Sequence, residues 1–182
     1  MFSRKRISRS LYKDIQSYIE QNLIEVKFAP RFVGAARKEC AASTAMPEPM
    51  VCNESAVPDD LDKALENIDE SFSEMLLRKI DEKGMSDSEC YKKAMIDRKL
   101  FSKIRSNRLY KPSKQTAISF AIALELDIDE AEDMLSKAGY ALSHSSKFDI
   151  IIEYFILQKN YNLFEINDAL YSFDQPVLSG KL

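Results

Sequence analysis

Between Leu61 and Phe173, apolar residues recur at helical spacing in a series of short segments, and this pattern constrains the fold most strongly. A Ser, Asp or Asn that can cap a helix begins most of these segments. The expected helices cover about 61–82, 87–95, 98–107, 113–126, 127–135, 146–158 and 162–173. We therefore predict an all-α protein.

A further amphipathic helix is expected near the amino end, where Ser10 can cap a segment that runs to about Leu23. Its apolar side chains are Leu11, Ile15, Tyr18 and Ile19. They either dock on the rest of the chain or form an interface with a partner protein or a second copy, and the pattern does not decide between these alternatives. Residues 35–60 contain three prolines and few large apolar residues, which is typical of a linker. The predicted organisation is a tethered helical segment (1–34), a linker (35–60) and a helical domain (61–182).

The segment from Arg98 to Lys114 contains seven basic residues and no acidic one, although the net charge of the whole chain is −3. Asp97 can cap a helix in which Phe101 and Ile104 point inward, so the basic side chains lie on the outer face. Such a face is either a solvated surface or a surface that contacts nucleic-acid phosphates.

Five short stretches here, 83–86, 96–98, 101–104, 111–113 and 121–130, follow the order of a known motif. Over about 72–139 the chain resembles the phage-repressor (Xre-type) helix-turn-helix family. The resemblance implies a five-helix DNA-binding domain with its helix-turn-helix at 86–107, extended here by two C-terminal helices. It implies a bacterial regulator of transcription that binds double-stranded DNA, with Arg98, Lys99 and Lys103 facing the bases. The residues expected at the DNA are Arg98, Lys99, Ser102, Lys103, Ser106, Asn107, Arg108 and Lys111.

Four positions depart from the family pattern. Asp87 replaces a Gln that bonds to DNA, and Tyr91 replaces a small Ala. Met95 stands where Gly usually takes a left-handed turn, and Leu100 stands at a small or polar outer position. These departures favour a second hypothesis, a non-enzymatic protein-interaction adaptor with Leu100 in its partner surface.

The sequence gives no support for an enzyme, a cofactor or a metal site. It contains no P-loop, GxGxxG, HExxH or nucleophile-elbow pattern, and the single histidine, His144, has no catalytic partner nearby in the sequence. The three cysteines form no CxxC pair. We expect a cytoplasmic protein without a membrane span or secretory signal, because the chain has no long apolar stretch and its basic amino end lacks an apolar core. The segment 146–158 is apolar nearly all round, so we expect it to be buried, with any leftover apolar face binding a second subunit.

Overall fold

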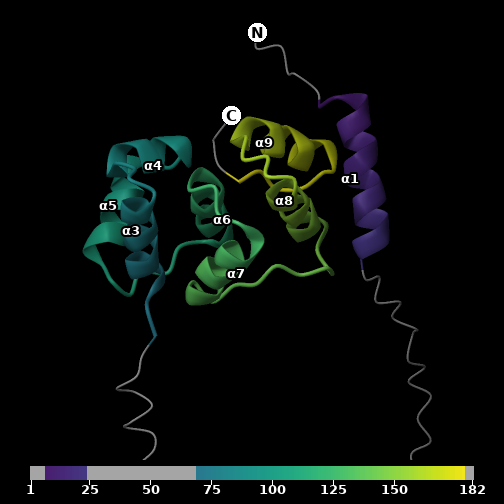
Figure 1. Ribbon diagram of the computed structural model, residues 1–182. Helices are drawn as coiled ribbons and strands as arrows, with labels where there is room; N and C mark the ends of the chain where they lie inside the picture. Colours follow the sequence, from purple (N-terminus) through teal and green to yellow (C-terminus); the bar gives the residue numbers. More distant parts are fainter. Residues whose placement is uncertain (1–6, 24–68, 179–182) are drawn as a thin grey trace, which may run out of the picture. The chain divides into compact units, whose positions relative to one another are not determined.

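The computed structural model describes residues 7–23 and 69–178, and in these ranges it contains eight helices and no strand (Figure 1). The all-α prediction is therefore confirmed for the described part of the chain. The predicted linker, 35–60, lies outside the described residues, as does 61–68 at the start of the first expected helix. The helices are α1 (Arg9–Asn22), α3 (Phe72–Glu82), α4 (Asp87–Lys93), α5 (Arg98–Ser106), α6 (Lys114–Ala123), α7 (Ile128–Lys137), α8 (Lys147–Leu157) and α9 (Leu163–Ser172).

Side-chain caps fix where the helices begin. Ser86 and Glu89 form the expected capping box of α4, because each side chain bonds to the backbone N–H of the other residue. A second box, formed by Ser71 and Glu74, starts α3 at Phe72. The prediction of one helix over 61–82 is therefore wrong at 69–71, which precede α3 and are not helical. The α1 cap is Ser8 and not Ser10, since the Ser8 hydroxyl accepts the Leu11 N–H.

Five helices, α3 to α7, follow one another between Phe72 and Lys137. A series of aromatic rings joins four of them. Phe72 of α3 lies 6.4 Å from Phe120 of α6, and Phe120 lies 6.0 Å from Phe101 of α5. Phe101 in turn lies 5.7 Å from Tyr91 of α4. These ring-centroid distances lie in the favourable range for aromatic pairs, so the series fixes the mutual placement of the four helices.

Helix α8 is buried on nearly all sides. Its residues Ile150 to Ile152 and Phe155 are fully buried. Helix α1 packs against α8, and its Ile15 and Ile19 join the same hydrophobic core. The apolar face of α8 that we expected to bind a second subunit is thus covered by α1 of the same chain. This packing also means that α1 is an integral part of the helical unit and not a separate tethered helix.

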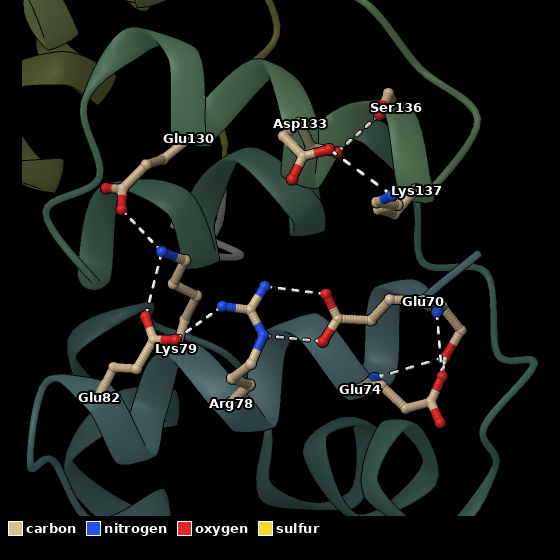
Figure 2. A network of polar contacts seen from close by, with 10 residues as sticks. Glu70, Glu74, Arg78, Lys79, Glu82, Glu130, Asp133, Ser136 and Lys137 are labelled. Carbon is tan, nitrogen blue, oxygen red and sulfur yellow. Dashed lines mark hydrogen bonds and ion pairs between the residues drawn. The ribbon is translucent and has the colours of Figure 1, made fainter.

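Ion pairs on the surface connect α3 with α7 (Figure 2). Lys79 of α3 contacts Glu130 of α7 at 2.7 Å and Glu82 at 3.1 Å. Arg78 binds Glu70 through two nitrogens, at 2.9 and 2.8 Å, and contacts Glu82 at 2.6 Å. The hydrogen bonds from Arg78 lower the pKa of the Glu70 and Glu82 carboxyls. Surface pairs contribute only about 0–1 kcal/mol each, and the pair described here that crosses from α3 to α7 is Lys79–Glu130, so this network adds little to the packing of the two helices.

Candidate nucleic-acid interface

The turn between α4 and α5 is built by backbone geometry at the end of α4. Met95 adopts a left-handed conformation with φ of 56°. Its N–H donates to Lys92 O, and the next N–H, of Ile96, donates to Tyr91 O at 2.8 Å. These two bonds close α4 and turn the chain toward Asp97.

Asp97 begins α5 as predicted. Its carboxylate accepts the Lys99 N–H at 2.6 Å. Phe101 and Ile104 are 4% and 1% exposed, so the inner face of α5 is locked into the core. The rotation of α5 about its axis is thereby fixed, and its polar and charged side chains face outward.

Six of the predicted DNA-binding residues lie on α5 or directly after it, and all are exposed: Arg98, Lys99, Ser102, Lys103, Ser106 and Asn107. Among the described residues, none carries an acidic side chain within ion-pair distance of Arg98, Lys99 or Lys103. Their cationic groups are therefore available to an anionic partner. The structure brings these three predicted base-facing residues together on one helix face.

Two further cations near α5 are bound to carboxylates. Arg105 forms an ion pair with Asp87 at the start of α4. Arg108 forms another with Glu74 of α3, at 2.7 Å. The pKa of Glu74 is lowered, mainly by the Ser71 backbone and hydroxyl bonds and further by Arg108. These two pairs reduce the positive charge that a ligand would meet beside α5.

A shallow depression of about 440 Å³ separates α4 from α5. Asp87, Tyr91, Arg98 and Arg105 contribute to its lining. Its walls therefore combine two guanidinium groups with one carboxylate, and of the two guanidinium groups that of Arg105 is already paired with Asp87.

The two lysines that flank Pro112 have different environments. Lys111 is exposed and, in the described part of the chain, forms no ion pair. Lys114 instead contacts the buried carboxylate of Asp149 at 2.7 Å. The cationic segment of the sequence thus divides into four open side chains (Arg98, Lys99, Lys103 and Lys111) and three that are paired (Arg105, Arg108 and Lys114).

The residues expected at a protein interface are mostly turned inward. Ile15 and Ile19 are buried, so these side chains contact the same chain and not a partner. Leu11 and Tyr18 are half-buried and pack on the same core. Leu100 is also half-buried against the core, so it presents only part of its surface beside the basic face.

Two other candidate groups are Cys90 and His144. Burial raises the pKa of the Cys90 thiol to about 12, so this cysteine is a protonated core side chain at neutral pH. His144 lies 2.8 Å from Glu153, which also accepts the Tyr18 hydroxyl at 3.2 Å. In the ranges that the structure describes, no group of His, Cys, Asp or Glu could hold a metal ion. Nor is any helix there long and apolar enough to cross a membrane.

Comparisons with protein-family models, curated proteins and solved structures find no match for this chain. The ion pairs of Arg105 and Arg108 were not anticipated from the sequence. Asp87 and Glu74 lie far from their partners along the chain, and no periodicity joins them. The exposed Leu109 in the turn after α5 was likewise not singled out, although its position among cations was visible in the sequence.

Proposed function

We propose that this protein is a DNA-binding helix-turn-helix protein that regulates transcription, with α5 as the helix that enters the major groove. The observation that supports this proposal is the outer face of α5. Arg98, Lys99 and Lys103 are exposed there without acidic neighbours, while Phe101 and Ile104 fix the helix from behind. A rigid cationic helix matches the charge of the phosphate backbone and the width of the major groove.

The test is a salt titration of binding to mixed-sequence duplex DNA, measured by fluorescence anisotropy. Arg98, Lys99 and Lys103 are all changed to Gln in one variant. On mixed-sequence DNA each of these three cations should neutralise about one phosphate, so the slope of log affinity against log salt should fall by about 0.9 per residue, or nearly three in all. Affinity at low salt should fall strongly as well.

A matched control separates local contacts from net charge. Lys13, Lys147 and Lys159 are exposed and lie away from α5, on α1, at the start of α8 and after α8. Changing these three to Gln removes the same charge and should leave most of the affinity and slope unchanged. Equal losses in the two triple variants would contradict the proposal, as would a native protein that does not bind DNA at low salt.

A protein-interaction adaptor on the same scaffold is the second candidate. It is favoured by Asp87, whose carboxylate lies beside the basic face and repels phosphate, and which already neutralises Arg105. In this case a partner protein should co-purify with the chain, and Leu100→Asp should abolish the complex while Lys103→Ala should preserve it. Because Leu100 is half-buried, a thermal unfolding curve must first show that Leu100→Asp remains folded.

A further inference from the structure

The turn that follows α5 presents an isolated apolar side chain to solvent. Leu109 is 76% exposed, more than any other large hydrophobic side chain in the part of the chain that the structure describes. Single exposed leucines are common on protein surfaces and by themselves indicate nothing. Leu109 differs in two respects, which are the rigidity of its backbone and the charge of its neighbours.

The backbone of this turn is held at several points. The Leu109 N–H donates to the Asn107 side-chain oxygen at 3.0 Å, and the Tyr110 N–H donates to Asn107 O at 3.0 Å. The buried Ser73 hydroxyl of α3 donates to that same carbonyl at 3.1 Å. These bonds form a side-chain-supported turn anchored on α3.

The second end of the turn is anchored too. Tyr110 packs on the core, and Pro112 is buried. The Tyr140 hydroxyl donates to Pro112 O at 3.2 Å. Leu109 is therefore held away from the core by a fixed backbone, so little conformational entropy is lost when a ligand covers it.

Cationic and polar side chains surround this leucine in the sequence. Arg108 precedes it, Lys111 follows two residues later, and Lys103 lies on the last turn of α5. The acidic group bound in this turn is Glu74, and its charge is compensated by Arg108. An apolar group between cations complements a surface on which apolar rings alternate with anions. The edge of duplex DNA has this character, since deoxyribose rings lie between successive phosphates.

We propose that Leu109 packs against the deoxyribose rings of the DNA backbone next to the groove occupied by α5, with Lys111 on a flanking phosphate. This contact extends the interface beyond α5, and it is independent of base sequence because every nucleotide carries the same sugar. This contact rests on the proposed DNA-binding function, so its test must distinguish a failure of the leucine contact from a failure of DNA binding.

The experiment repeats the salt titration on mixed-sequence duplex DNA with Leu109→Ala and Leu109→Met. An apolar contact releases no counterion, so Leu109→Ala should weaken binding about fivefold at every salt concentration without changing the salt slope. Leu109→Met should retain the native affinity, because it preserves apolar area. Lys111→Ala should instead lower the slope by about one.

Leu157→Ala is the matched control, because Leu157 is an exposed leucine at the end of α8, 48% exposed. It should bind DNA as the native protein does. If the native protein binds DNA and Leu109→Ala binds equally well, the leucine contact is refuted while the proposed function stands. A changed salt slope in Leu109→Ala would also refute it, since the leucine would then act through its charged neighbours. If the native protein shows no salt-dependent binding, both proposals fail together.

Discussion

Six helices of the described chain end in the same way, with one residue in the left-handed conformation. The N–H of the left-handed residue donates to the carbonyl of the residue three positions earlier. The N–H of the next residue donates to the carbonyl five positions earlier, as Gly84 N–H does to Asp81 O and Met85 N–H to Ile80 O. This is the bond pattern of a Schellman cap. Glycine occupies the left-handed position after α3 and α7, as Gly84 and Gly139. The other four helices use a residue with a side chain: Met95, Glu125, Lys159 and Asp174.

A residue with Cβ in this conformation is strained by about 1 kcal/mol. Lys159 is exposed with φ of 52°, so Lys159→Gly should relieve the strain without loss of packing and stabilise the protein by about 0.5–1 kcal/mol. Gly139→Ala, at φ of 81°, should destabilise it by about 1 kcal/mol. Urea unfolding measures both changes. Two shifts of the same sign would contradict the assignment of strain to backbone conformation.

At this scale the sequence predicts helix starts better than helix ends. Ser86, Asp97 and Ser113 cap their helices as expected, because the bond from a capping side chain is local. Glu125 and Lys159 give no such signal, since the backbone imposes a left-handed turn on residue types that disfavour it. The prediction of charged contacts fails for a related reason. The pairing of Asp87 with Arg105 depends on how α4 and α5 pack, which periodicity does not specify.

Between elements, an ion pair between a half-buried lysine and a buried carboxylate joins α6 to α8. Lys114 begins α6, and its ammonium donates to Asp149 Oδ2 at 2.7 Å and to Ala141 O at 2.8 Å. The same Lys114 nitrogen lies 2.7 Å from the second carboxylate oxygen, Oδ1, within ion-pair distance. Oδ1 itself accepts no hydrogen bond within the described residues. The Ser143 N–H also donates to Asp149, which is 2% exposed. Lys114 is therefore a half-buried partner of Asp149 and not part of the open basic face of α5.

Removing the lysine would leave a buried carboxylate without its counter-charge. Lys114→Met should destabilise the protein by about 3 kcal/mol, because breaking one side of a buried pair leaves its desolvation uncompensated. Lys111→Met, three residues earlier, is the control, and it should change the free energy of unfolding by less than about 0.5 kcal/mol because Lys111 is exposed. Chemical denaturation measures both. Similar, small effects of the two variants would contradict this account of the Lys114–Asp149 pair.

At the scale of elements, the number and order of helices in the described part followed from the spacing of apolar residues. The spacing did not, however, indicate which surface α1 packs against. Its apolar face fits a partner protein as well as it fits α8, and the choice depends on shape complementarity between two separate faces. The structure shows that Ile15 and Ile19 pack with α8 in one core. Whether the basic face of α5 binds DNA is likewise beyond what helical periodicity specifies, and it stays a prediction.

For the whole molecule, the closure of α1 over α8 depends on one polar contact as well as on apolar packing. The Tyr18 hydroxyl of α1 donates to Glu153 of α8, and the Tyr18 ring lies 5.3 Å from that of Tyr154. Burial, followed by the negative charge and the hydrogen bond of Glu153, raises the pKa of Tyr18 to about 12. In an unfolded chain a tyrosine titrates near pH 10.

These two values give the direction of a pH effect. The folded state holds the Tyr18 proton more tightly than the unfolded state, so this stabilisation is complete below about pH 10. It should be lost progressively as the pH rises through the folded value of about 12, when a phenolate would face the Glu153 carboxylate.

Urea unfolding at a series of alkaline pH values should show this decline, and Tyr18→Phe should flatten it. Some decline should remain in that variant, because burial also raises the pKa of Cys90, to about 12, and those of Tyr154 and Tyr161. Glu153→Gln should lower the pKa of Tyr18 in the folded protein only part of the way toward its unfolded value, because burial, the larger cause of the rise, persists. The pH range over which stability declines should therefore become narrower but remain. A Tyr18→Phe protein with the native pH profile would show that this contact does not hold α1 in place.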